Sequence, residues 1–123
     1  MSNPLVHAER SARKWGGTPD EYLELHQFFD QTKAHVPDNR HRLILHNSFG
    51  IHLAEQVFGL RIINSNGKRV FVRDVGAQHV LEDLGFIPTL ARCLEGVSIL
   101  PWMGGANVTK RSTQSTKGAE SDE

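Results

Sequence analysis

Hydrophobic positions recur with helical spacing along most of the chain, and turn signals divide this pattern into segments. Residues 4–15 predict a first helix, which a Gly-Gly pair ends. Thr18 and Glu21 form a Thr-x-x-Glu capping box around a first-turn proline, so we expect a second helix from residue 18 to about residue 35. A third helix is predicted from residue 38 or 39 to about residue 58, where a glycine stops it.

After residue 59 the hydrophobic spacing changes from helical to alternating. Residues 60–64 and 68–73 predict two strands joined by Asn64-Ser65-Asn66-Gly67, so we expect a β-hairpin at about 60–73. Two further helices are predicted at about 75–84 and 89–94. The expected fold is a small, mainly helical α+β domain with about five helices. A lone hairpin is marginal in water, so it must pack on the helices or pair with another chain, for example in a homodimer.

The end of the chain has a different composition from the rest. Residues 104–123 consist mostly of Ser, Thr, Lys, Gly and acidic residues, without apolar anchors. This composition predicts a disordered C-terminal tail that follows a single globular domain at residues 1–103.

Composition and charge restrict the class of protein. The 123 residues suit one domain, and 38% of them are hydrophobic, as in an ordinary globular protein. Fourteen basic residues balance fourteen acidic ones, which argues against a general nucleic-acid binder or a binder of anionic membranes. Cys93 is the only cysteine, so an intramolecular disulfide and a four-cysteine zinc site are excluded. The N-terminus lacks the apolar run of a signal peptide, and we expect a cytoplasmic protein.

Histidine supplies the candidate chemistry, with seven residues in the chain. On the predicted third helix, His46 and Asn47 lie within an otherwise apolar face. A buried polar group without a partner costs about 1–3 kcal/mol, so a backbone carbonyl, a water, a metal or a ligand must satisfy these two. His26 and Asp30 are spaced i, i+4 on the second helix, where they can bond each other or share a metal.

A second i, i+4 pair, His79 and Asp83, lies on the predicted fourth helix. It faces away from the apolar side, so a solvated face is expected unless the helix lines a cleft. His41 and His52 are predicted to be solvent-exposed. A further polar stripe on the first helix is also predicted to be solvated, with phosphate binding as the alternative; it contains His7, Arg10, Ser11 and Lys14.

These residues lead to a hypothesis of a divalent-metal site between the second, third and fourth helices. Its ligands would be His26, His46 and His79, with Asp30 or Asp83 completing the set. Imidazole and carboxylate ligands suit Zn, Fe or Mn. Three ligands and an open position would let a metal-activated water attack a phosphate ester or an amide. Structural hydrogen bonds are the alternative reading of each pair, since the chain has none of the specific metal-protease, Cys-x-x-Cys, phosphate-loop or serine-elbow motifs.

The order of several short motifs resembles a known family. The motifs are His7-Ala8, Ser11-Ala12-Arg13-Lys14-Trp15-Gly16-Gly17, His26-x-x-Phe29-Asp30, Arg40-His41-Arg42, Gln78-His79-Val80-x-Glu82-Asp83-Leu84-Gly85 and Ile87-Pro88-Thr89. Together they are similar to a small family of uncharacterised proteins of bacteria and their phages, described only as a domain of unknown function. The resemblance covers about residues 7–104. It implies a stand-alone one-domain protein in a bacterial or phage-infected cell, and it implies no activity.

Two departures from the family pattern bear on the metal hypothesis. The pattern has a histidine at the position of Asn47 and a glutamate at that of Ala77, and the site would be weakened if those side chains are ligands. The main rival is an accessory protein that is not an enzyme and modulates a host protein, through the hairpin edge or the Arg40-His41-Arg42 region. A third reading keeps the metal as a purely structural element.

Overall fold

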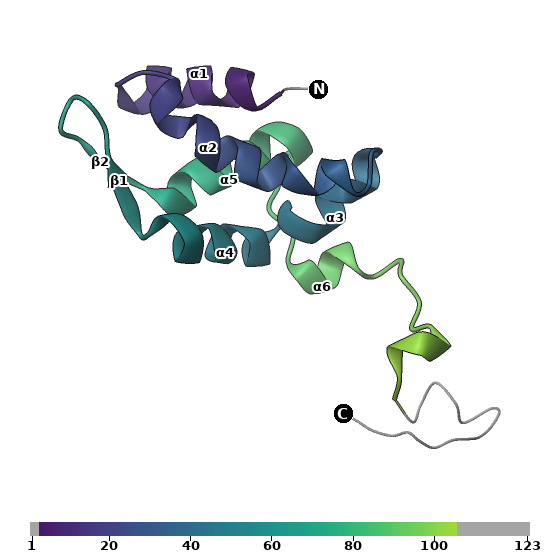
Figure 1. Ribbon diagram of the computed structural model, residues 1–123. Helices are drawn as coiled ribbons and strands as arrows, with labels where there is room; N and C mark the ends of the chain where they lie inside the picture. Colours follow the sequence, from purple (N-terminus) through teal and green to yellow (C-terminus); the bar gives the residue numbers. More distant parts are fainter. Residues whose placement is uncertain (1–2, 106–123) are drawn as a thin grey trace.

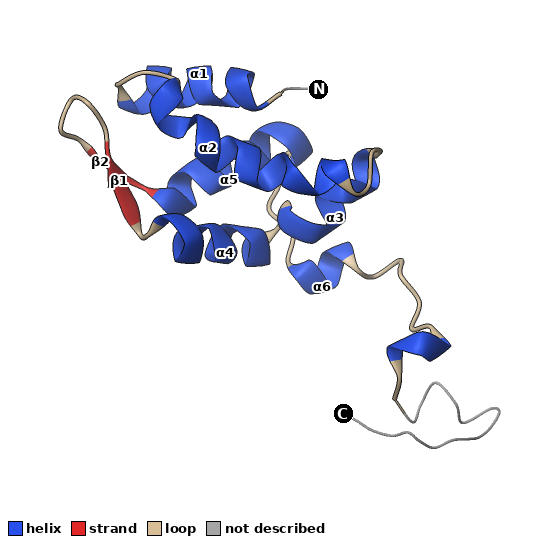
Figure 2. Ribbon diagram, viewed as in Figure 1, coloured by secondary structure: helices blue, strands red, loops and turns tan. Residues whose placement is uncertain are grey.

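The computed structural model describes residues 3–105 and confirms a small, mainly helical α+β domain. Within these residues, six α-helices accompany one two-stranded antiparallel hairpin (Figures 1 and 2). The helices are α1 Pro4–Trp15, α2 Asp20–Asp30, α3 Arg42–Leu45, α4 Ser48–Phe58, α5 Val72–Leu84 and α6 Leu90–Cys93; the strands are β1 Arg61–Ile63 and β2 Arg69–Phe71; and the short 3₁₀ turns are η1 Gln31–Ala34, η2 Asn39–His41 and η3 Pro101–Met103. The tail predicted to be disordered lies, from residue 106 onward, outside the described residues.

Helix α5 forms the centre of the domain, with α1, α2 and α4 packed against it (Figure 1). Its apolar residues Val75 and Val80 are fully buried, as are Tyr22 and Phe29 of α2. Gly76 lets α2 approach closely, because a Cβ there would lie 2.8 Å from the Phe29 ring. The ring of Phe29 also stacks on that of His79, so the apolar core directly adjoins the histidines.

The hairpin is anchored to the α1–α2 connection by its turn. Residues Arg61 and Ile63 pair with Phe71 and Arg69, and Gly67 takes the positive φ of 80° that the turn requires. The side-chain amide of Asn64 donates to the Trp15 carbonyl and the Tyr22 hydroxyl, at 3.0 and 3.2 Å. Among the described helices, none is long and apolar enough to cross a membrane.

The prediction of one continuous third helix is wrong. The chain leaves helical geometry at His46 (φ −82°, ψ 61°) and Asn47 (φ −161°, ψ 178°), which separates α3 from α4. The Asn47 side chain explains the break, since its Oδ1 accepts from the Gly50 N–H at 2.9 Å and caps α4. Its Nδ2 donates to the Leu43 and Ile44 carbonyls at the end of α3. The side chain of Asn47 thus makes the hydrogen bonds that a continuous helix would make between its backbone groups.

We therefore expect Asn47→Ala to destabilise the protein by about 2 kcal/mol, because it removes a buried cap and leaves the α3 carbonyls unpaired. Urea unfolding followed by circular dichroism measures this. Asn47→Ser keeps a capping oxygen but has no donor for the α3 carbonyls, and it should lose less stability than the alanine variant. An equal loss in both would show that the cap bond to Gly50 adds no stability.

Beyond α6 the chain extends away from the helices (Figure 1). Its large apolar side chains are exposed, up to 78% for Trp102, and the others are Leu94, Val97, Ile99, Leu100 and Met103. The segment therefore contributes little to the core.

Candidate metal site

Four donor atoms from three separate parts of the fold meet beside Phe29. Asp30 ends α2, His46 lies in the break between α3 and α4, and His79 and Asp83 lie one turn apart on α5. Their ligand-type atoms all lie within 4.8 Å of one another, and we call these residues the four-donor group. The side chains of both histidines are fully buried, that of Asp83 is 3% exposed and that of Asp30 is 11% exposed. The break in the third helix is what carries His46 into this group.

Four of the six distances among these atoms lie near the edge length of a tetrahedron around a metal ion. His79 Nε2 lies 3.3 Å from both Asp30 Oδ1 and Asp83 Oδ2. His46 Nε2 lies 2.9 Å from Asp83 Oδ2 and 3.5 Å from Asp30 Oδ1. Bonds of about 2.0–2.1 Å to a tetrahedral zinc ion require ligand atoms about 3.3–3.4 Å apart. These atoms are thus close enough to one another that they could hold a metal ion.

A second group, which we call the histidine trio, consists of His7, His26 and His79, all fully buried. His26 Nε2 lies 2.8 Å from the Ser11 hydroxyl, which itself donates to Gln78 Oε1 at 2.6 Å. His26 Nδ1 lies 3.0 Å from His79 Nδ1. Because Ser11 uses its proton elsewhere, these distances suit a neutral His26 that donates from Nε2 and accepts from His79 at Nδ1.

His7 connects the trio to the carboxylates of α5. Its Nδ1 lies 2.6 Å from Glu82 Oε1, and its Nε2 lies 3.2 Å from Asp83 Oδ1 without hydrogen-bond geometry. Asp83 therefore has one oxygen toward His7 and the other toward His46 and His79. Gln78 Nε2 donates to Glu82 Oε2 at 3.1 Å and to the His7 carbonyl at 3.0 Å, which fixes the orientation of α1 on α5.

The electrostatics of the cluster separate its ionised groups from its neutral ones. Burial raises the pKa of the Asp83 carboxyl, but the hydrogen bond from His46 and the close approach of His7 and His79 outweigh it and keep the pKa well below its usual range. For His79, burial lowers the pKa, and its hydrogen bonds with Asp30 and Asp83 reverse this and raise it above the ordinary value. A proton on His79 thus holds the two carboxylates together, in the place where a cation would be bound.

The pKa values of His26 and His46 are lowered, opposite to that of His79. Burial, helped by the charges of His79 and His7, lowers the pKa of His26 to about 2. Burial also lowers the pKa of His46, although its bond to Asp83 opposes the change. Both imidazoles are therefore neutral in the folded protein near neutral pH, which is the state that binds metals.

These shifts predict how the stability of the chelated protein depends on pH. Unfolded histidines take up protons below a pH of about 6.5, whereas the lowered pKa values of folded His26 and His46 delay this to a lower pH. As the pH falls below about 6.5, the free energy of unfolding therefore falls by up to about 1.4 kcal/mol per pH unit for each. His79 acts in reverse: its raised pKa stabilises the fold below a pH of about 6.5, and this contribution disappears as the pH rises through the folded pKa.

We accordingly expect stability to be highest slightly above the ordinary histidine pKa and to fall steeply on the acid side. Urea unfolding of the chelated protein at a series of pH values measures this. The exposed His52 provides the control, because His52→Gln should leave the profile unchanged. A flat profile between about pH 7 and pH 5 would contradict the account.

Several buried nitrogens around the cluster have no hydrogen-bond partner. They are His46 Nδ1, His7 Nε2 and both ring nitrogens of His41, whose ring lies 5.6 Å from that of His46. Buried unpaired polar atoms are rare in native proteins, and they concentrate where water or ions bind. Within the described residues, these nitrogens therefore remain available to a water, an ion or a ligand.

The structure corrects three sequence-based expectations about these side chains. His41 is buried rather than exposed, because the 3₁₀ turn η2 directs it toward His46. His7 and Ser11 are buried instead of solvated, because α1 packs that stripe onto α2 and α5. The His79 and Asp83 side chains point inward, while Leu81 on the same helix is 46% exposed, so α5 buries a polar face that its sequence does not mark as core.

Other expectations hold only in part. His46 and Asn47 are both buried, as predicted, but through a helix break and not on one helix face. His52 is exposed. The direct His26–Asp30 pair does not form, since both nitrogens of His26 face Ser11 and His79. His7, which the sequence places on a solvated stripe and outside the predicted ligand set, also belongs to the cluster; its i, i+4 spacing to Ser11 was the available signal.

Comparison with known proteins adds the family. The family model described as a domain of unknown function (DUF6915) matches residues 2–103. The chain belongs to this family. The match confirms the resemblance to a family of unknown function, and the DUF6915 region includes all six described helices and every residue of the four-donor group and the histidine trio. No curated protein and no solved structure matches the chain.

Proposed function

We propose that this DUF6915 protein binds a divalent transition-metal ion through the four-donor group, Asp30, His46, His79 and Asp83. The observation that carries the proposal is the spacing of the four donor atoms, at 2.9–3.5 Å for the pairs His46–Asp83, His79–Asp30, His79–Asp83 and His46–Asp30. Two imidazoles and two carboxylates form a ligand set suited to Zn, Fe or Mn.

His26, which the sequence suggested as a ligand, has a different role in this proposal. With a metal on His79 Nε2, the remaining proton of His79 is on Nδ1, 3.0 Å from the neutral His26 Nδ1. Histidine ligands are commonly oriented by a hydrogen bond of this kind from their second nitrogen. Ser11 in turn holds His26, so the chain Ser11–His26–His79 fixes the ligand's tautomer.

The position of the group first suggests a structural role for the ion. It would connect the end of α2, the α3–α4 break and α5, three segments far apart in the sequence, and four donors complete a tetrahedral zinc ion. Fe or Mn, with higher coordination numbers, would keep positions open for hydrolysis of a phosphate ester or amide. A divalent metal supplies such a reaction with a nucleophile near neutral pH by lowering the pKa of water. The substrate would approach from the side of Asp30, the most exposed of the four side chains.

Titration of the chelated protein with Co²⁺ tests the ligand set. Tetrahedral Co²⁺ absorbs visible light much more strongly than octahedral Co²⁺, so a strong band that saturates at about one equivalent is expected. His46→Gln should lose the band, whereas the exposed-site control His52→Gln should keep it. Failure of the wild-type protein to bind Co²⁺ would reject the proposal. If the protein hydrolyses phosphate-ester or amide substrates with Mn²⁺ or Fe²⁺ but not with Zn²⁺, the ion has a catalytic role with open coordination positions.

A second candidate function is binding to a host protein, and exposed apolar side chains favour it. Residues 94–103 expose six large apolar side chains, and Leu60, Ile63 and Phe71 are exposed on the hairpin. Exposed apolar groups that cluster on a surface commonly mark interaction sites. Both the host partner and a homodimer through the hairpin remain predictions, as do the cytoplasmic location and the bacterial or phage setting. Light scattering of wild-type protein and of Ile63→Lys measures whether the hairpin holds a dimer.

A further inference from the structure

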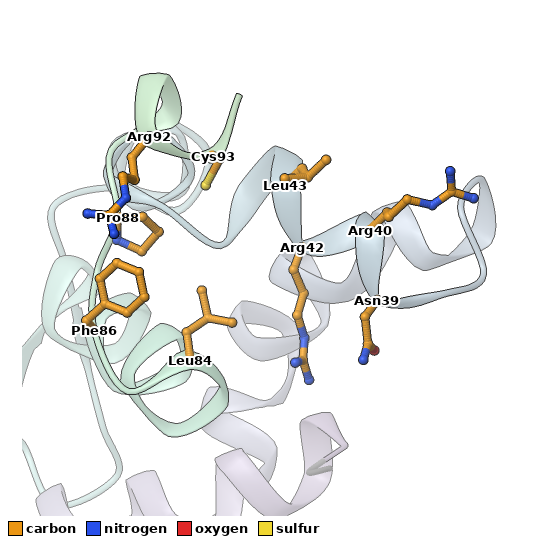
Figure 3. A pocket seen from close by; sticks show the side chains of 9 residues that line it. All are labelled: Asn39, Arg40, Arg42, Leu43, Leu84, Phe86, Pro88, Arg92 and Cys93. Carbon is orange, nitrogen blue, oxygen red and sulfur yellow. The ribbon is translucent and has the colours of Figure 1, made fainter. Parts of the chain in front are cut away.

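An open pocket lies beside the four-donor group, between the η2–α3 segment and the chain from Leu84 to α6 (Figure 3). Its volume of about 490 Å³ is in the range typical of small-molecule sites. Apolar side chains and arginines line it: Leu43, Leu84, Phe86, Pro88, Arg40, Arg42, Arg92, Asn39 and Cys93. None of these lining residues is acidic, and none belongs to the four-donor group.

Arg42 gives the pocket its chemical character. Its guanidinium side chain is only 17% exposed, and its Nε is buried without a hydrogen-bond partner. The nearest carboxylate, Asp83, lies 3.7 Å from Nη2, beyond hydrogen-bond distance. Asp83 Oδ1 thus forms an ion pair with Arg42 Nη2 without a hydrogen bond, and the Nε–H of Arg42 is left for another acceptor. A buried guanidinium with an unused N–H is costly, and an oxyanion ligand would satisfy it.

The other two arginines differ in how they are held. Arg40 forms a close pair with Asp38, with Nη2 2.8 Å from Oδ2, and in Figure 3 it points away from the other lining side chains. Arg92 lies over the Phe86 ring at 5.4 Å, and Glu95 reaches it only at 3.8 Å. Arg92 and Arg42 therefore lie on opposite sides of the pocket with Leu84 between them (Figure 3). The pocket has positive charge on both sides and an apolar surface between.

We propose that this pocket binds a small organic anion, a phosphate or carboxylate carried on an aromatic or aliphatic body, with Arg42 holding the oxyanion and Arg92 adding positive charge across the apolar surface. Arginine binds planar or tetrahedral oxyanions through paired N–H groups. Leu43, Leu84 and Phe86 supply contact for the apolar body. A purely inorganic anion would leave this surface unused, and a neutral apolar compound would leave Arg42 unsatisfied. Anion binding here does not require a bound metal, since no residue of the four-donor group lines the pocket.

Cys93 makes the proposal testable with the full-length protein. It lines the pocket, and it is the only cysteine of the chain, so alkylation by iodoacetamide followed by intact mass reports on one position. We expect saturating phenyl phosphate or benzoate to slow alkylation about fivefold or more, because a ligand of this size fills the space before the thiol. Whichever of the two anions protects at the lower concentration identifies the oxyanion as phosphate or carboxylate. At the same concentrations, inorganic phosphate and neutral benzyl alcohol should slow it less than about twofold.

Variants of Arg42 and Arg40 distinguish hydrogen bonding by Arg42 from the general effect of a positive charge near the pocket. Arg42→Gln should raise the half-protecting concentration by about tenfold or more, the usual value of a hydrogen bond to a charged group. Arg40→Gln is the matched control and should change it less than about twofold, since Asp38 already occupies that side chain. Should Arg42→Gln fail to fold, Arg42→Lys takes its place: it keeps the positive charge but has no Nε–H, and a loss of about threefold or more is expected.

These outcomes decide whether the pocket binds an organic anion. They do not depend on whether the four-donor group binds a metal. The proposal is overturned if neither organic anion protects Cys93, if benzyl alcohol protects equally well, if inorganic phosphate protects equally well, or if Arg40→Gln and Arg42→Gln lose protection alike. Protection that persists after chelation supports the pocket whether or not the four-donor group binds a metal.

Discussion

Replacing Asp83 by asparagine should reduce metal affinity by at least about 100-fold and destabilise the chelated protein by about 3–5 kcal/mol. The first effect follows because Asp83 Oδ2 lies 2.9 Å from His46 Nε2 and 3.3 Å from His79 Nε2, at the centre of the proposed ligand set. Even residues that only orient a ligand are worth about 10–100-fold in affinity. The second follows because the carboxylate is buried between histidines and is ionised, and removal of one partner of a buried pair costs this much.

Asparagine preserves the volume of the side chain, so the loss cannot be attributed to a cavity. Asp74→Asn makes the same chemical change on the exposed first turn of α5 and provides the control, with an expected effect below about 1 kcal/mol and no change in affinity. Urea unfolding and Co²⁺ titration of both variants supply the two readouts. If Asp83→Asn bound Co²⁺ as wild type does, Asp83 could not be a ligand.

Gly50→Ala should be more damaging than an ordinary glycine substitution in a helix, with a destabilisation of about 4 kcal/mol or more. An added Cβ would lie 1.8 Å from the Leu45 carbonyl oxygen and 2.5 Å from its carbon, both backbone atoms that cannot rotate away. The chain could accommodate it only by opening the α3–α4 break. Because His46 lies within that break, the variant should also lose metal affinity, unlike a variant destabilised elsewhere.

Gly96→Ala is the control, since a Cβ there meets no atom within 4 Å, and its effect should be below about 0.5 kcal/mol. Thermal unfolding of the two variants side by side measures the difference. A Gly50→Ala protein with near-wild-type stability would mean that the tight approach of α4 to Leu45 is not required by the fold.

Much of the fold could be predicted because its signals are local. The glycine stops and the Asn-Gly turn act within a few residues, and α1 and the hairpin formed where these signals lie. The predicted Thr18 cap did not form, because α2 begins at Asp20 after Pro19, without a side-chain cap bond. The third helix was predicted wrongly because its decisive feature is one side chain. Asn47 suits a polar position on a helix and equally suits a cap, and the apolar periodicity on both sides of it does not distinguish the two.

The candidate site was less predictable because it depends on how helices pack. The histidines and aspartates could be chosen by residue type and spacing, and four of the five chosen side chains lie in one group. Which face of α5 is buried could not be read from the sequence. That helix has apolar residues around its circumference, and α1, α2 and α4 enclose His79 while Leu81 stays exposed. His7 joined the cluster only through the packing of α1 on α5.

The central claim, that the four-donor group binds a metal, is tested most directly by elemental analysis of protein purified without an affinity tag. Metal content is measured before and after chelation, with the melting temperature recorded each time. The account predicts about one Zn, Fe or Mn per chain and a melting temperature lower by about 10 °C or more after chelation, which is restored by adding the metal back. Protein that contains none of these metals, and that none of them stabilises on addition, would contradict it.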